Sequence, residues 1–354
     1  MPERISIYDT KRLDELRREL RLDSQSIRRL RNDLLKRFHL DDEALEKFEA
    51  ADRLTIHSLK LHQRCDSKID GASKLLFRTA AGMLIESVIL RIATGRTTLC
   101  VSSQVGCAAA CDFCATGKMG IAQNLTSDEI LDQILQAGQL IADEGRRLRN
   151  IVFMGMGEPF HNEQVLYETL ERLTAAELFH HSPTKILVST VGVADAMVRS
   201  ARRFPQVNLA LSLHSVNPTI REQLIPLAKK FPLDQLRETL SEVNRLQNCT
   251  VMIEYLMLAG LNDSDDDARE LIAWLDGLNV HVNLIPYNPI DDAPHLTGTE
   301  QPRRDEFAGM LKQAGLKTTI RYSLGNDIAA ACGQLVKKEN RQIARELNTL
   351  LMDK

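Results

Sequence analysis

From residue 98 onward, short apolar runs alternate with longer amphipathic segments. The runs are rich in Val, Ile and Leu and lie at 98–102, 151–154, 186–190, 207–213, 251–256, 280–285 and 318–321. Apolar runs of this length are typical of strands buried on both faces. Because helix-like stretches separate most of them, the pattern predicts parallel strands joined by crossover helices. The fold class we expect is α/β, a partial (β/α)6 barrel with its chemistry at the carboxyl ends of the strands.

The first of these helices has a clear start signal. Thr126 and Glu129 have the spacing of a capping box, in which each side chain satisfies a backbone group of the other. Ile130, Ile134 and Ile141 then fall on one helical face. We therefore expect an amphipathic helix directly after residue 126.

Upstream of the barrel the pattern changes to two strand-like runs, at 74–78 and 83–90, joined by a turn at Ala81 and Gly82. Before residue 60 the chain is highly charged, and leucines at positions 13, 16, 20, 30 and 34 predict amphipathic helices. The domain organisation we expect is a helical accessory module over 1–70, a hairpin-like extension over 71–97, a barrel over 98–340 and a helical tail over 341–354.

The amino-acid composition limits the class of protein but does not indicate a specific function. The chain has 354 residues, 44% of them hydrophobic and 26% charged, which is typical of a globular protein with a sizeable core. A formal net charge of −3 gives no global support for a nucleic-acid partner. Locally, residues 11–37 carry ten basic against five acidic side chains, so either a solvated helical face or an RNA-contacting surface fits them.

The sequence also bears on location. No apolar stretch is long enough to span a membrane, and the first residues lack the apolar core of a signal peptide. Seven cysteines is an odd number, and four of them fall between residues 100 and 114, which favours a reducing compartment over a disulfide framework. We expect a cytoplasmic protein with no membrane association.

The strongest chemical signal is the spacing CxxxCxxC at Cys107, Cys111 and Cys114. Three thiolates on one short loop can hold three corners of a 4Fe-4S cluster, which normally takes four cysteines, so one iron is left open. A zinc site is the alternative, but zinc modules usually pair two such units and no partner unit follows. The loop, with Phe113 before its last cysteine, resembles that of the radical S-adenosylmethionine (SAM) superfamily, in which the open iron binds SAM and SAM is split to a radical.

Polar and glycine residues follow several of the expected strands. They are Gly157, Glu158, Ser189, Ser212, His214 and Asn288, with Leu213 between two of them. For each one alone, a local turn or capping role is the competing explanation. Together they could contact the ribose, carboxylate and adenine of one SAM molecule, and Gly157 with Glu158 looks like the superfamily's element for the SAM amine.

Two further cysteines are candidates for catalysis. Cys332 follows the last strand among small residues, where a thiolate nucleophile is plausible. Cys100 lies seven residues before the cluster motif and could face the same cavity. A free cysteine is often only a small buried apolar residue, and we interpret Cys65 and Cys249 in that way.

Several motifs together resemble the RlmN/Cfr family of radical-SAM RNA adenosine methyltransferases. They lie at 99–107, 107–117, 154–159, 211–215, 283–289 and 327–335. The resemblance implies that Cys332 takes a methyl group from one SAM, that a second SAM yields a radical which activates this methyl group for addition to adenine, and that Cys100 resolves the RNA adduct through a disulfide. Glu86 aligns with the family's base, and a carboxylate suits the proton removal that restores the aromatic ring.

The chain departs from the family in two places. Phe160 and His161 replace the apolar pair that usually follows the Gly-Glu-Pro motif. The Pro-Phe/Tyr-Arg-x-x-Gln segment that usually marks the accessory RNA-binding module is not found. The substrate is therefore less firmly indicated than the chemistry.

The leading hypothesis is methylation of adenosine carbon 2 in 23S ribosomal RNA, with transfer RNA as a further candidate substrate. Carbon 8, the Cfr-like resistance activity, is the alternative within the family. A relative that binds without methylating would not need Cys100, Cys332 and Glu86 together, and a radical SAM enzyme for small molecules or peptides has no use for a methyl-carrying thiol.

The resemblance also implies a 4Fe-4S cluster and SAM as cofactors and a reducing partner such as flavodoxin or ferredoxin, and we expect a monomer.

Overall fold

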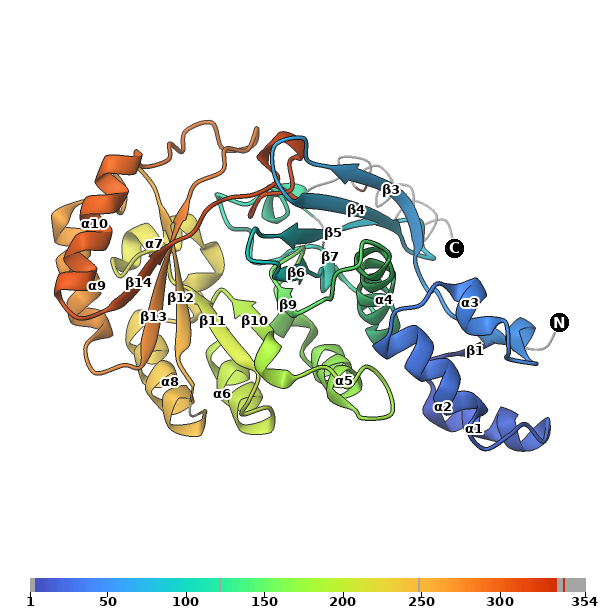
Figure 1. Cartoon of the computed structure of the whole chain (residues 1–354). Helices are drawn as coiled ribbons and strands as arrows, with labels where there is room; N and C mark the ends of the chain where they lie inside the picture. The colour runs from blue at the N-terminus through green and yellow to red at the C-terminus, as the bar shows by residue number, and fades with distance from the viewer. Residues whose placement is uncertain (1–3, 121, 248, 336–339, 341–354) are drawn as a thin grey trace, which may run out of the picture.

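A single long sheet organises the protein (Figure 1). The computed structural model describes residues 4–120, 122–247, 249–335 and 340. Within this part of the chain, ten strands follow the order β14-β13-β12-β11-β10-β9-β6-β5-β4-β3. One end of the sheet is parallel and the other antiparallel, so two differently built regions share one set of backbone hydrogen bonds.

The parallel region is the predicted partial barrel. Its strands are β6 (Thr97–Cys100), β9 (Asn150–Phe153), β10 (Ile186–Thr190), β11 (Asn208–Ser212), β12 (Val251–Met257), β13 (Val280–Pro286) and β14 (Lys317–Ile320). Each is parallel to the next along the chain. Their carboxyl ends therefore meet at one edge of the curved sheet, as the alternating pattern predicts.

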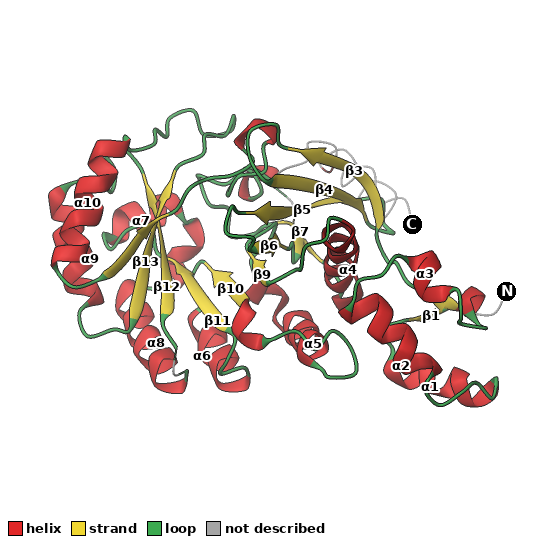
Figure 2. Cartoon of the chain, viewed as in Figure 1, coloured by secondary structure: helices red, strands yellow, loops and turns green. Residues whose placement is uncertain are grey.

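Helices cover the outer face of this curved sheet (Figure 2). They are α4 (Ser127–Asp143), α5 (Glu163–Thr174), α6 (Ala194–Arg203), α8 (Leu233–Leu246), α9 (Asp265–Leu275) and α10 (Gln301–Gln313). The short helix α7 (Pro218–Leu224) lies instead beyond the carboxyl end of β11, where the Leu224 carbonyl accepts from the Asp112 amide. The capping box at the start of α4 is present, because Thr126 Oγ1 accepts from the Glu129 amide at 3.2 Å and Glu129 accepts from the Thr126 amide at 2.8 Å. Ile130, Ile134 and Ile141 are fully buried, so the apolar stripe faces the sheet as predicted.

The antiparallel region extends the sheet beyond β6. It consists of β3 (Lys60–Asp66), β4 (Ala72–Arg78) and β5 (Leu84–Arg91). The turn between β4 and β5 places Gly82 at φ +84°, a conformation that favours glycine. The sequence does not predict β3, because this edge strand is mostly exposed and charged and lacks an apolar face.

The amino-terminal residues form a small helical layer against α4. Its helices are α1 (Thr10–Glu19), α2 (Ser26–Arg31), a π-helical continuation over Asn32–Lys36 and α3 (Asp41–Leu45), and its two short strands are β1 (Ile5–Ser6) and β2 (Leu54–Thr55). Leu13, Leu16, Leu30 and Leu34 are buried, whereas Leu20 is 40% exposed. The predicted amphipathic helices are thus present, with one leucine on the solvent side.

A partly buried ion network joins this layer to the barrel. His57 Nδ1 contacts Asp132 of α4 at 2.6 Å, and its Nε2 contacts Asp41 of α3 at 2.8 Å. Asp132 also accepts from the Leu59 amide at 2.7 Å. Burial disfavours a charged imidazole, but the hydrogen bonds to Asp132 and Asp41 prevail and raise the pKa of His57 to about 10. We call this network the His57 clamp.

The remaining elements are short. A two-stranded ribbon, β7 (Gln104–Gly106) with β8 (Ala122–Asn124), stands beside the main sheet. Single 3-10 turns occur at Ala51–Arg53, Gly117–Met119, Pro159–Asn162, Pro183–Lys185, Pro226–Lys230 and Asn326–Ile328. In the described part of the chain, none of the helices has the length and apolarity to cross a membrane. The helical tail expected over 341–354 lies outside the described residues.

Candidate active site

The cysteine loop lies at the carboxyl end of β6, between the two strands of the β7–β8 ribbon. Inside the loop, the Cys114 amide donates to the Cys111 carbonyl at 3.2 Å. Gly117 is needed here, because a Cβ at this position would lie 2.9 Å from the Cys111 amide nitrogen. The backbone thus folds back on itself and brings Cys107, Cys111 and Cys114 to the wall of one cavity.

The segment that carries Cys332 is bound directly to this loop. The Ala115 amide donates to the Gly333 carbonyl at 2.7 Å, and Thr116 Oγ1 donates to the Leu335 carbonyl at 2.5 Å. Asn288 Nδ2 donates to the Cys332 carbonyl at 3.1 Å. Residues that are far apart in the sequence are therefore held as one unit, with Cys332 beside the cysteine loop.

A small cavity, which we call the loop cavity, opens beneath the three cysteines. Its volume is about 130 Å³. Most of the residues that the sequence singles out for SAM line it: Phe113, Gly157, Glu158, Ser189, Ser212 and His214. Leu213 and Asn288 do not line it. Leu213 is fully buried, and the Asn288 side chain supports the Cys332 segment instead.

Glu158 is a deeply buried acid of the loop cavity, with 2% of its surface exposed. It accepts from the Val191 amide at 2.8 Å and the Phe160 amide at 3.1 Å. Burial raises the pKa of Glu158 to about 7, and the two backbone donors only partly oppose that shift. Gly157, at φ +106°, leaves no room for a Cβ, which would lie 2.7 Å from the Gln104 Cβ.

His214 and Phe113 meet across the loop cavity, edge to face, with ring centroids 4.8 Å apart. His214 Nδ1 accepts from the Leu256 amide at 3.0 Å. Burial, and secondarily the charge of Arg221, lowers the pKa of His214 to about 3. The imidazole is therefore neutral at physiological pH, and its ring packs beside the cysteine loop as an aromatic wall.

The donor set of the loop fits an iron–sulfur cluster. Burial raises the pKa of Cys107 to about 12 and also raises that of Cys111 and Cys114, and the charge of Cys114 further disfavours ionisation of Cys107 and Cys111. Three neighbouring thiolates thus need a cationic group between them. Among the described residues, no three His, Cys, Asp or Glu side chains approach closely enough to hold a single metal ion. The ligands of a cubic cluster stand farther apart than those of one ion.

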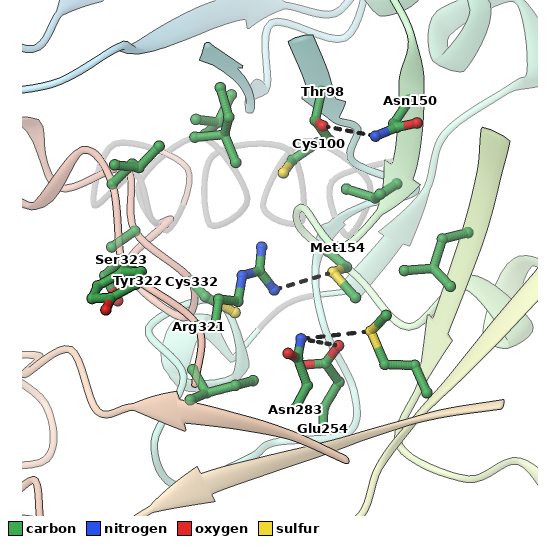
Figure 3. A pocket seen from close by; sticks show the side chains of 18 of the residues that line it. Thr98, Cys100, Asn150, Met154, Glu254, Asn283, Arg321, Tyr322, Ser323 and Cys332 are labelled. Carbon is green, nitrogen blue, oxygen red and sulfur yellow. Dashed lines mark hydrogen bonds between the residues drawn. The ribbon is translucent and has the colours of Figure 1, made fainter. Parts of the chain in front are cut away.

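A larger cavity of about 920 Å³, which we call the barrel cavity, extends along the inward face of the strands (Figure 3). Cys100 lines it from β6 and Cys332 from the carboxyl-terminal segment. Both thiols are free, as are the other five cysteines. Desolvation raises the pKa of Cys100 to about 11 and also raises that of Cys332, an exposed residue that lines the cavity, while Arg321 opposes both shifts.

Glu86 occupies a different position. It is fully buried on β5, with its Oε1 3.9 Å from the Lys74 ammonium, and it lines neither cavity. Val88 and Leu90, which follow it at alternate positions of β5, do line the barrel cavity. Glu86 therefore shares their face of the strand but lies farther along it.

Four functional candidates were missed by sequence reasoning. Arg221 is 1% exposed, and its guanidinium donates to the Ser212, Leu213 and Val191 carbonyls, which joins the ends of β10 and β11 beside Cys111. Glu254, Asn283 and Arg321 project inward from β12, β13 and just beyond β14. For Glu254 and Asn283, the one available signal was a polar residue at an inward position of an otherwise apolar strand. For Arg221 and Arg321 the sequence offered no such signal.

Comparison with known proteins gives a consistent result. The family model described as the radical SAM superfamily matches residues 101–275. A crystal structure of a radical SAM methyltransferase from Sphaerobacter thermophilus superposes with a TM-score of 0.87 and 37% identity, covering 94% of this chain and 99% of that one.

Curated relatives extend the match to nearly the whole chain. A probable RNA methyltransferase of Rhodopirellula baltica is 61% identical over 345 residues, covering 98% of this chain and 91% of the relative. A probable dual-specificity RNA methyltransferase RlmN 2 of Protochlamydia amoebophila is 39% identical, covering 86% of this chain and 84% of the relative. A ribosomal RNA large subunit methyltransferase Cfr of Staphylococcus warneri is also 39% identical, covering 79% of this chain and 80% of the relative.

Proposed function

The chain belongs to the RlmN/Cfr family of radical SAM RNA methyltransferases, and on this premise we propose that it methylates carbon 2 of an adenosine in 23S ribosomal RNA, with transfer RNA as a second substrate. Its cofactors are a 4Fe-4S cluster and SAM. The names of two relatives support an RNA substrate, since one is called a dual-specificity RNA methyltransferase and the other a large-subunit ribosomal RNA methyltransferase.

One observation carries the proposal. Cys332 and Cys100 face the same cavity, and the segment of Cys332 is hydrogen-bonded to the cysteine loop. Radical SAM chemistry on a small molecule needs the three thiols of the cysteine loop but not the additional thiols of Cys100 and Cys332. Methylation through a cysteine needs a thiol that receives the methyl group and another that releases the product, and the two must share one space.

The cofactors have residues suited to them. In our proposal Cys107, Cys111 and Cys114 hold the cluster, and Phe113, Gly157, Glu158, Ser189, Ser212, Leu213, His214 and Asn288 surround or support SAM. When bound, the cluster and SAM supply the radical chemistry that activates an otherwise inert methyl group. An external flavodoxin or ferredoxin provides the electron.

The protein's own groups perform the remaining steps. The Cys332 thiolate takes the methyl group from one SAM, S-adenosylhomocysteine leaves, and Arg321 favours the ionised form of the thiol. Carbon 2 of adenine is not nucleophilic, so the methyl carbon must be activated before it bonds to the base. The Cys100 thiolate then attacks the Cys332 sulfur: a disulfide forms, the bond between that sulfur and the carbon breaks, and the carbon takes up a proton to leave a methyl group on the RNA. Glu86 is our candidate for the base that removes the ring proton.

Mass spectrometry of nucleosides tests the proposal directly. Ribosomal and transfer RNA from a strain without such enzymes would be incubated anaerobically with reconstituted protein, SAM and a reductant. We expect 2-methyladenosine, and fragment mapping would show which RNA carries it. A peak of 8-methyladenosine instead would keep the cysteine chemistry but overturn carbon 2. Cleavage of SAM with neither nucleoside would contradict both RNA assignments.

A further inference from the structure

Glu254 and Asn283 form a polar pair on the inward face of the barrel (Figure 3). They are direct neighbours in the register of β12 and β13. Asn283 Nδ2 lies 3.3 Å from each carboxylate oxygen of Glu254 and 3.5 Å from the Met252 sulfur. Contacts of this length are weak hydrogen bonds. A ligand with better-placed polar atoms can therefore replace them at little cost.

The position of this pair relates it to the reacting carbon. Cys332, Arg321 and Glu254 line both the loop cavity and the barrel cavity, so they stand where the two spaces meet. The loop cavity, with the three cysteines and Glu158, is the side that suits SAM. A base that bonds to the carbon on Cys332 must approach from the other side, and the barrel cavity is the larger space.

A buried carboxyl group at this place needs an explanation. Only 2% of Glu254 is exposed, and removing a carboxylate from water is costly unless it gains partners. Burial raises the pKa of Glu254, while the charge of Arg321 and the contact with Asn283 oppose this shift. The packing of β12 and β13 could be served by apolar residues, as it is by Ile253 and Val282 on the other face.

We propose that Glu254 and Asn283 recognise the amino edge of the target adenine, and this inference rests on the function proposed above. The Glu254 carboxylate accepts a hydrogen bond from the exocyclic amino group, and Asn283 Nδ2 donates to the adjacent ring nitrogen. Adenine presents this donor beside an acceptor, whereas guanine presents an oxygen that the carboxylate repels. The pair therefore selects adenine and fixes the orientation of its ring at Cys332.

Removing the amino group from the substrate and the negative charge from the protein's acceptor tests this contact. The probe is a synthetic RNA spanning the adenosine mapped by the nucleoside experiment, made with adenosine or with purine riboside, which lacks the amino group, at that position. For the unaltered protein we expect kcat/KM to be about tenfold to a hundredfold lower with purine riboside. Glu254→Gln keeps a neutral carbonyl acceptor but loses the charge, so it should lower kcat/KM for adenosine by a smaller factor and leave purine riboside nearly unchanged.

Two further measurements separate recognition from folding. Glu254→Gln should keep the cluster absorbance and the methylation of Cys332 itself, which intact-protein mass spectrometry detects as one added methyl group. Glu238→Gln, on the exposed face of α8, is the control for loss of one carboxylate and should change neither substrate.

The outcomes are distinct. Equal losses on both RNAs, or no loss on either, would overturn the recognition role while leaving the methyltransferase function intact. If the unaltered protein methylates neither RNA although Cys332 is methylated, the proposed function itself fails, and this inference fails with it.

Discussion

The reaction centre and the His57 clamp both bury ionisable groups, but the cost of burying those groups is offset by different partners in the two regions. In the clamp, Asp132 receives hydrogen bonds from His57, the Leu59 amide and Gln136 Nε2, so the protein itself supplies every partner. In the cysteine loop, burial and then the charges of Cys114 and Glu158 disfavour ionisation of Cys107 and Cys111. The first arrangement is complete without a ligand, whereas the second gains its partners from the cofactors. Substitutions should therefore affect stability in one region and chemistry in the other.

The largest effect is expected in the cysteine loop. Replacing Cys107, Cys111 or Cys114 by Ala should abolish the brown iron–sulfur absorbance and all SAM cleavage, because the remaining thiols cannot hold the cluster. Iron analysis and absorbance spectra measure this. Cys65→Ala, on the exposed edge strand β3, is the matched control and should load a full cluster. A full cluster in any of the three loop variants would contradict the ligand assignment.

The next effect separates the two thiols of the barrel cavity. Cys332→Ala should keep the cluster but form no methylated RNA, because no thiol remains to carry the methyl group. Cys100→Ala should instead accumulate a covalent RNA–protein adduct, since nothing releases the product. A denaturing gel shows the adduct as a shifted band. Methylated RNA from the first variant, or no adduct with the second, would remove the corresponding role.

On the clamp side, Asp132→Asn should lower the free energy of unfolding by about 2–3 kcal/mol, because a buried anion with several donors is lost. The midpoint of urea unfolding measures the change. Asp143→Asn, at the exposed end of α4, should stay within about 0.5 kcal/mol of the unaltered protein. If both variants behave alike, the clamp does not fasten the helical layer.

The last effect is a dependence on pH. The pKa of His57 is raised from about 6.5 to about 10 in the folded protein, so the charged imidazole contributes its full stability below pH 6.5. That contribution is lost as the pH rises from 6.5 through 10. Urea unfolding at pH 6 and pH 9.5 should show the loss, and His57→Gln should reduce it. An identical pH dependence in the variant would show that another group titrates.

Much of this architecture is predictable from the sequence. Apolar runs place all the parallel strands, because strands buried on both faces leave a strong pattern. The cysteine spacing and the glycine at 157 likewise indicate where the backbone meets a ligand. Edge strand β3 was missed because its side chains are solvated and carry no periodic signal.

The sequence does not reveal which side chains from separate strands lie close together. Glu254, Asn283 and Arg321 come from separate elements and meet around one cavity only when the sheet curves. Neither Glu254 nor Arg321 belongs to a local motif whose spacing implies a role. Asn288 and Glu86 show the reverse case, since each was singled out from the sequence but lines neither cavity. The assignment of roles to these two residues therefore stays a prediction.

The hydrogen bond from Thr116 to the Leu335 carbonyl joins residues 219 positions apart, and this has a consequence for how the protein is made. A ribosome adds about 5–20 residues per second, so the cysteine loop is synthesised roughly ten to forty seconds before its partner segment. During that interval the nascent loop lacks the contacts that complete its pocket. Cluster insertion is therefore expected after translation ends, by delivery to the finished chain. A chain that stops before Gly325 would show this as incomplete iron uptake.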